Sequence, residues 1–126
     1  MRAVAVLVGV FLLAGCTGGP THATLAPLPT DFTVTQPAAA GEVVEATYVL
    51  NVTTATRLNA TLVWGTAGNR LDLDLTAGGS GGQQGTVVGT VSRLEWTLYP
   101  ATYVLKVSGR PVAADTWHLE AHFTRG

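Results

Sequence analysis

The sequence predicts an all-β protein, a sandwich or barrel of about eight antiparallel strands. Apolar and polar residues alternate over most of the chain after residue 31, Thr and Val are abundant, and Gly or Pro separates most of the alternating runs. A period of two places one side of each strand on a core and the other in solvent, as in antiparallel sheets. Short strands at this spacing, without a helical segment between them, are typical of sandwiches and barrels.

The expected strands follow one another at short intervals along the chain. They cover residues 32–34, 44–52, 57–64, 71–75, 87–91, 94–98, 103–107 and 117–123. Trp64, Trp96 and Trp117 fall on the inward register of their strands, so we expect core residues first and a sugar-stacking platform as the alternative. Tyr99 is expected to be partly exposed. The glycine-rich residues 77–85 predict a flexible loop.

The first fifteen residues predict a secretory signal peptide. Arg2 supplies a positive charge, and residues 3–14 form an apolar run interrupted only by Gly9. A membrane-spanning helix needs about 20 apolar residues, so this run is too short to remain as an anchor.

The end of this run is Leu13-Ala14-Gly15-Cys16, an aliphatic residue and two small residues before the single cysteine of the chain. It resembles the lipobox of bacterial and some archaeal lipoproteins, and the alternative is an ordinary signal peptide with a chance cysteine. The resemblance implies cleavage before Cys16 and a lipid such as palmitate on its thiol, which anchors the protein to the membrane. Thr17 stands where an Asp favours retention at the inner membrane. We therefore expect a cell-envelope protein facing outward from the cytoplasmic membrane, on the outer membrane in a Gram-negative host.

Residues 16–30 are expected to tether the lipidated cysteine to a domain formed by residues 31–126. Residues 17–30 contain three prolines, two glycines and four threonines, and no regular apolar period runs through them. This composition is typical of a semi-extended linker.

Several motifs occur in a fixed order within the domain. They are Trp64, Leu71-Asp72-Leu73-Asp74-Leu75, Glu95-Trp96, Pro100-Ala101-Thr102-Tyr103-Val104-Leu105-Lys106-Val107 and a final strand from Trp117 to Phe123. In order and spacing, residues 42–123 resemble the bacterial pre-peptidase C-terminal domain, although the family has Pro-Gly where this chain has Pro100-Ala101. The resemblance implies an antiparallel, jelly-roll-like β-sandwich that serves as a binding module, and some relatives bind calcium.

Two aspartates make a candidate calcium site. Asp72 and Asp74 are two residues apart on an expected strand, so their carboxylates share one face, and carboxylate oxygens are calcium ligands. Glu95 is the third candidate ligand. Alternatively, the aspartates accept hydrogen bonds from loop amides or pair with Arg70 or Arg93. No other cofactor is expected.

His118, Glu120 and His122 form a second, alternative candidate metal site on the last strand. Neighbours two residues apart lie about 6.6 Å apart on a strand, but His118 and His122 are about 13 Å apart. Zinc needs three or four ligands, so this trio cannot close a site unaided. A solvated outer face is the alternative.

Composition limits the function further. The formal net charge is −1, so no basic surface supports nucleic-acid binding, and one cysteine excludes an intramolecular disulfide framework. No serine lies in a nucleophile-elbow context, which places a G-x-S-x-G serine between a strand and a helix. The expected function is a non-catalytic, lipid-anchored binding module for an extracellular or periplasmic protein or polysaccharide. The alternatives are a structural or accessory subunit of an envelope complex and, more remotely, a hydrolase.

Overall fold

The computed structural model describes residues 21–77 and 82–125, so Cys16 and the expected signal peptide lie outside the described residues. Every regular element in the described ranges is a β-strand. The strands are β2 (His22–Leu25), β3 (Asp31–Ala38), β4 (Val44–Val52), β5 (Thr56–Trp64), β6 (Leu71–Ala77), β7 (Gly82–Gln84), β8 (Thr86–Val88), β9 (Val91–Leu98), β10 (Ala101–Gly109) and β11 (Asp115–Arg125). Over the same residues, no helix is long and apolar enough to cross a membrane.

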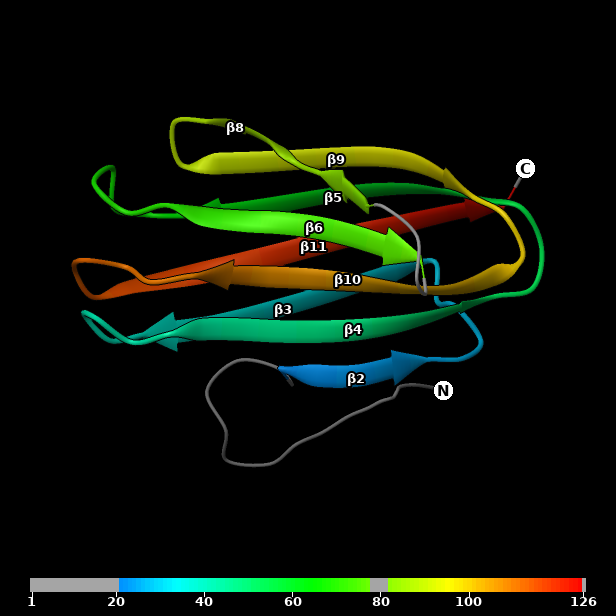
Figure 1. Ribbon diagram of the computed structural model, residues 1–126, viewed down its shortest axis with the longest axis horizontal. Coiled ribbons are helices and arrows are strands. Elements are labelled where there is room, and N and C mark those ends of the chain that lie inside the picture. The colour runs from blue at the N-terminus through cyan, green and yellow to red at the C-terminus, as the bar shows by residue number, and fades with distance from the viewer. Residues whose placement is uncertain (1–20, 78–81, 126) are drawn as a thin grey trace.

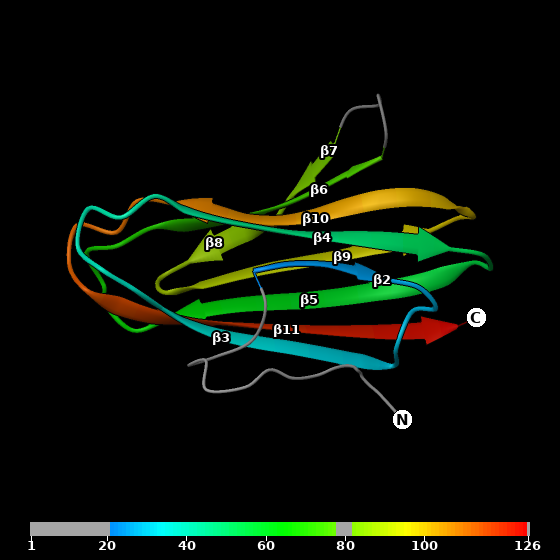
Figure 2. The same ribbon diagram turned by 90° about the horizontal axis from the view of Figure 1, so that it is seen from below.

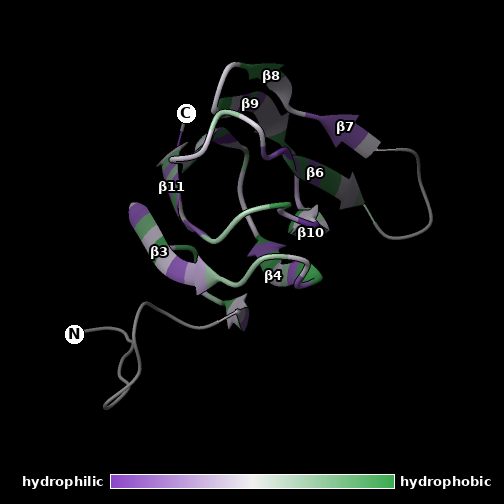
Figure 3. Ribbon diagram, turned by 90° about the vertical axis from the view of Figure 1, so that its left-hand side faces the viewer, coloured by the Kyte–Doolittle hydropathy of each residue, from purple (hydrophilic) through white to green (hydrophobic). Residues whose placement is uncertain are grey.

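The strands form two five-stranded sheets that pack face to face (Figures 1 and 2). The first sheet has the order β2-β4-β10-β6-β7, and the second has the order β3-β11-β5-β9-β8. Every neighbouring pair is antiparallel except β2 and β4, which are parallel. Seen along the strands, β3 lies beside β4 on one side of the sandwich, and β9 lies beside β6 on the other (Figure 3). The predicted all-β fold is confirmed as a sandwich.

The core fills the space between the sheets because apolar residues alternate along almost every strand. The inward residues are buried along the whole of β4 and β5 and in β6, β10 and β11 except at strand ends. Tyr48 is fully buried, and its ring packs edge-on against Phe32 of the opposite sheet with centroids 5.1 Å apart. This burial raises the pKa of the Tyr48 phenol above its ordinary value. The two sheets therefore share one continuous core.

The ordered sheet begins earlier than the expected domain boundary at residue 31. Residues 22–25, expected to lie in the tether, form β2 alongside β4, and the N–H of Thr47 donates to the carbonyl of Thr21 at 2.9 Å. Leu28 is buried in the core, and Arg125 donates to its carbonyl at 3.1 Å. The expectation of a tether over the whole of residues 16–30 was therefore wrong from residue 21 onward.

The segment expected to be a loop at residues 77–85 contains a further strand. β7 pairs with β6 of the first sheet, and two residues later β8 pairs with β9 of the second, whereas residues 78–81 lie outside the described part. Gly85 makes the crossing, and its N–H donates to the carbonyl of Leu73 at 2.7 Å. A Cβ at residue 85 would lie 2.4 Å from Oγ of Ser92, so any larger residue at the crossing would have to displace this buried side chain.

Candidate functional site

The acidic pair of β6 lies on the outer surface of the first sheet. Asp72 and Asp74 are both half-buried, on the face opposite the buried leucines of this strand, as the alternation predicted. Nε of Arg70 donates to Oδ1 of Asp72 at 3.2 Å, which is one of the partners expected for this carboxylate. Asp74 lies opposite Lys106 of β10 in the strand register.

Asp74 has an unfavourable environment for its charged form. Partial burial raises the pKa of Asp74, the nearby Asp72 carboxylate raises it further, and Lys106 opposes both. Lys106 itself forms an ion pair with Glu45 of β4 at 3.2 Å. The pair of aspartates therefore belongs to a band of opposite charges across the sheet, and calcium binding by the pair stays a prediction.

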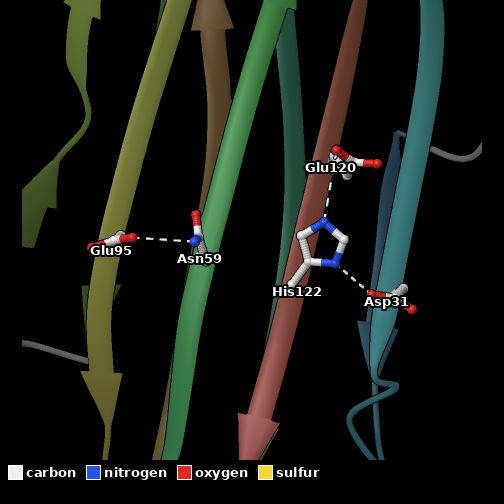
Figure 4. A network of polar contacts seen from close by, with 5 residues as sticks. All are labelled: Asp31, Asn59, Glu95, Glu120 and His122. Carbon is white, nitrogen blue, oxygen red and sulfur yellow. Dashed lines mark hydrogen bonds and ion pairs between the residues drawn. The ribbon is translucent and has the colours of Figure 1, made fainter.

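Glu95 lies on the opposite side of the molecule from these aspartates. It is on the outer face of β9 in the second sheet, where Nη2 of Arg57 donates to it at 3.3 Å and Nδ2 of Asn59 at 3.1 Å (Figure 4). The core separates the two outer faces, so Glu95 is not close to Asp72 and Asp74. The sequence alone could not reveal this, because it does not say to which sheet each strand belongs.

The three polar residues of β11 share the outer face of the second sheet, as predicted. The imidazole of His122 lies between two carboxylates: its Nδ1 bonds to Asp31 of β3, and its Nε2 is 3.7 Å from Oε1 of Glu120 (Figure 4). His118 bonds instead to the hydroxyl of Thr35 at 2.7 Å. Both histidines of β11 are thus paired with a residue of β3, and His122 also lies close to Glu120.

The pairing changes the acidity of His122. Its hydrogen bond to the Asp31 carboxylate raises the pKa of His122 above its ordinary value, slight desolvation acts in the opposite direction, and the charges of Asp31 and Glu120 add to the rise. A protonated ring in this position holds an edge strand to its neighbour. Among residues 21–77 and 82–125, no group of three or more His, Cys, Asp or Glu is arranged to hold a metal ion.

Two of the three tryptophans are core residues, and one is not. Trp64 and Trp117 are each 2% exposed, as expected, whereas Trp96 is 43% exposed. Trp96 does occupy the inward register of β9, and its smaller register neighbours Leu94 and Leu98 are buried. The expectation that Trp96 is a core residue was therefore wrong. Tyr99 is 64% exposed, in agreement with the sequence.

A buried amide that the sequence did not single out joins two loops at one end of the sandwich. Oδ1 of Asn69 accepts the N–H groups of Val112 and Ala113 at 2.8 and 3.1 Å, and its Nδ2 donates to the carbonyl of Ala113 and to Asp115. The carbonyl of Asn69 accepts the indole N–H of Trp64 at 3.0 Å. The loop after β5 is therefore fixed to the loop before β11.

Asp115 completes this connection from the other side. Its carboxylate accepts the N–H groups of Gly65, Thr66 and Thr116 at 2.8–3.0 Å in addition to the amide of Asn69. Burial alone would raise the pKa of Asp115, but these hydrogen bonds outweigh it and lower the pKa below the ordinary value. The sequence contains two signals for this connection, an Asn in a Gly-containing turn and an Asp at the start of a strand. It does not show that the two residues lie next to each other, which follows only from the fold.

A shallow polar groove lies where β3 and β4 meet at one side of the sandwich. Its lining includes Gln36, Pro37, Glu42, Glu45 and Thr21, above the buried Trp117. Oε1 of Glu42 is already used, because it accepts the N–H of Ala39 at 2.7 Å. The groove offers no ligand set beyond these surface carboxylates.

No protein-family model and no curated protein matches this sequence. Solved structures do match the fold. The pre-peptidase C-terminal domain of a collagenase from Bacillus anthracis has a TM-score of 0.63 at 15% identity, over 86% of this chain and 99% of that domain. Two structures of PliG, a periplasmic inhibitor of g-type lysozyme, also match. The Aeromonas hydrophila protein has a TM-score of 0.52 at 11% identity, over 82% of this chain and 97% of that chain. The Salmonella Typhimurium protein has a TM-score of 0.50 at 13% identity, over 75% of this chain and 88% of that chain.

These likenesses define a class of fold. The chain has a two-sheet antiparallel β-sandwich of the kind found in the pre-peptidase C-terminal domain, as the sequence motifs implied. At these identities, the likeness concerns the fold alone.

Proposed function

We propose that this chain is a lipid-anchored protein of the cell envelope whose β-sandwich is a non-catalytic binding module. The observation that supports the binding role is the shared fold, because neither a pre-peptidase C-terminal domain nor a lysozyme inhibitor is a catalytic unit. Function resides in sites placed on a fold, so the partner is a separate question. The partner is an extracellular or periplasmic protein or polysaccharide, reached without any enzymatic step.

The candidate chemical groups agree with a binding role. The acidic pair lies on one outer face, and Glu95 and the two histidines of β11 lie on the other. Each of these groups has a partner that suits a structural role, such as Arg70 for Asp72 or Asp31 for His122. A hydrolase needs a nucleophile and a base within hydrogen-bonding reach, and these groups are spread over two surfaces.

The lipid anchor is the second part of the proposal, and it rests on Leu13-Ala14-Gly15-Cys16. The described residues begin at Thr21, next to β4, so four residues of sequence, 17–20, stand between Cys16 and the sheet. An extended chain spans at most about 3.6 Å per residue, so Cys16 and Thr21 are at most about 18 Å apart. The sandwich is then held close to the membrane, where it meets partners at the membrane surface.

Replacing Cys16 tests the anchor. We expect the parent protein to enter the detergent phase with a mature mass that starts at Cys16 and includes acyl groups. Cys16→Ala should be soluble or unprocessed, whereas Thr17→Ala, which keeps the lipobox, should behave as the parent does. An unchanged mass and membrane partition in Cys16→Ala would overturn the anchor. Recovery of the parent in a fixed ratio with one envelope complex would favour the accessory-subunit alternative.

A further inference from the structure

Strand β9 has a neighbour on both sides along only part of its length. β5 pairs with β9 from Val91 to Leu98, whereas β8 pairs only with Val91 to Arg93. In the described part of the chain, no strand pairs with residues 94–98 on the β8 side. The chain enters β8 from the first sheet at Gly85, so β8 does not continue along β9 (Figure 1). The second sheet therefore has a free edge of five residues.

The register shows which backbone groups point to this edge. The N–H of Trp64 donates to the carbonyl of Thr90 at 3.0 Å, and these residues continue the register in which Val63 lies opposite Val91. Hydrogen-bonded and non-hydrogen-bonded pairs alternate along antiparallel strands. Even-numbered residues of β9 therefore bond to β5. The N–H and C=O groups of Glu95 and Thr97 point away from β5, towards the free edge.

An aromatic side chain lies between these two residues. Trp96 is on the inner side of β9 but is 43% exposed, and Tyr99, just beyond the strand, is 64% exposed. Natural edge strands are commonly guarded by Pro, by charged side chains, especially Lys, or by bulges. Residues 94–98 contain neither Pro nor Lys, and their one charged side chain, Glu95, is paired with Arg57 of the neighbouring β5, whereas the edge strand β3 contains Pro37. This edge is therefore open to another strand.

The charges around the edge favour an acidic ligand. Arg57 is paired with Glu95, but Arg93 is exposed and forms no ion pair within the described residues. Arg93 lies where β8 ends its pairing and the free stretch begins. A strand added beside residues 94–98 would carry its outward side chains next to this arginine.

We propose that the free edge of β9 binds an extended polypeptide segment of a partner protein by strand addition. The segment would bond to the backbone of Glu95 and Thr97, place an apolar side chain against Trp96 and place a carboxylate beside Arg93. This inference rests on the proposed binding function and specifies a protein partner instead of a polysaccharide. Alternate residues of an extended chain repeat at about 6.8 Å, so a second backbone matches the exposed groups of Glu95 and Thr97.

The test uses the full chain in detergent micelles and a phage-displayed library of random twelve-residue peptides. Selected peptides should show alternating apolar residues and an Asp or Glu, and the tightest is then synthesised for calorimetry. Thr97→Pro removes an N–H that faces the free edge without removing a bond to β5, so its affinity should fall about tenfold. Thr97→Val keeps the N–H and should bind as the parent does.

Two more variants measure how much the side chains of Trp96 and Arg93 each contribute to the affinity for the peptide. Trp96→Ala should weaken binding about 30-fold, as truncation of an interface tryptophan commonly does. Arg93→Gln should weaken it less, and the difference from the parent should shrink at high salt. If Thr97→Pro fails to fold, a peptide N-methylated at the nitrogens that face β9 should lose binding, and one methylated at the alternate nitrogens should keep it.

Several results would overturn strand addition. One is equal affinity of Thr97→Pro and the parent, which would leave the binding function intact but place it elsewhere. A second is a selection in which no peptide is enriched on the parent relative to a parallel selection on Thr97→Pro. A third is a dimer of this chain that Thr97→Pro dissociates, because a second copy would then occupy the edge. Trp96-dependent binding of a glycan in place of a peptide would also overturn it.

Discussion

At the scale of single residues, a few buried polar groups hold the loops in place. Asn69 is 5% exposed and bonds through both side-chain polar atoms and through its carbonyl. Its amide matches four partners, and a hydrophobic residue could satisfy none of them. Such a group stabilises the fold only because every partner is in place.

Asn69→Ala is therefore expected to lower the free energy of unfolding by about 2 kcal/mol, since it removes four hydrogen bonds and leaves part-buried backbone groups of the loop before β11 without their partner. Urea denaturation of the variant measures this loss. Asn51→Ala is the matched control, because Asn51 makes a single 3.3 Å bond to Thr102 on the outer face of the first sheet. Equal losses in both variants would show that the loop connection adds no stability.

Ser92 gives the opposite expectation. It is fully buried on β9, and its hydroxyl has no hydrogen-bond partner among the described residues. Ser92→Ala removes this unsatisfied group and should raise the free energy of unfolding by about 1 kcal/mol. Ser108→Ala, on the half-buried outer side of β10, should change little. A clear loss of stability in Ser92→Ala would indicate that the hydroxyl has a partner after all.

Among the strands, two tryptophans that both lie in the inward register differ in their surroundings. Trp117 is on β11, which has a neighbour on both sides, whereas Trp96 is on the part of β9 that pairs only with β5. Trp117→Ala removes a fully covered indole from the central region of the second sheet and should cost about 3–5 kcal/mol. Trp96→Ala removes a side chain that is already 43% exposed and should cost about 1–2 kcal/mol. Thermal unfolding of both variants compares the two losses. Equal losses would place Trp96 in the core.

Strand β3 depends on pH through His122. The pKa of His122 is raised in the folded protein by its bond to Asp31, so the stabilisation is complete below the ordinary pKa of about 6.5. It is lost as the pH rises through the higher folded value. The melting temperature of the parent should therefore fall from pH 6 towards pH 8 by more than that of His122→Gln. His118→Gln keeps the pair with Asp31 and should retain the parent's slope. A parent and His122→Gln with parallel profiles would contradict this account.

At the scale of the whole molecule, the alternation of apolar residues was sufficient to predict the sandwich but not its edges. Leu58, Leu62, Leu105 and Leu119 are buried as expected, because central strands cover both sides of each inward residue. β2 and β7 are four and three residues long, so neither contains enough alternating positions for a signal. The same limit explains the wrong position of the expected domain boundary.

The candidate sites were predictable within a strand but not between strands. The shared face of Asp72 and Asp74 follows from a period of two, as does that of His118 and His122. The separation of Glu95 from the aspartates depends on which sheet each strand joins. Likewise, Trp96 is exposed where β9 has no second neighbour, because β8 begins opposite Arg93. The start of β8 is set by the crossing of the chain at Gly85.

Photo-crosslinking in intact cells can show whether the free edge of β9 contacts a partner in the envelope. A benzophenone amino acid replaces Tyr99, beside the free edge of β9, or Thr102, on the outer face of the first sheet. We expect one discrete adduct from position 99, lost when Thr97→Pro is added, and none from position 102. No adduct from position 99, or the same unspecific products from both positions, would show that no partner protein occupies this edge.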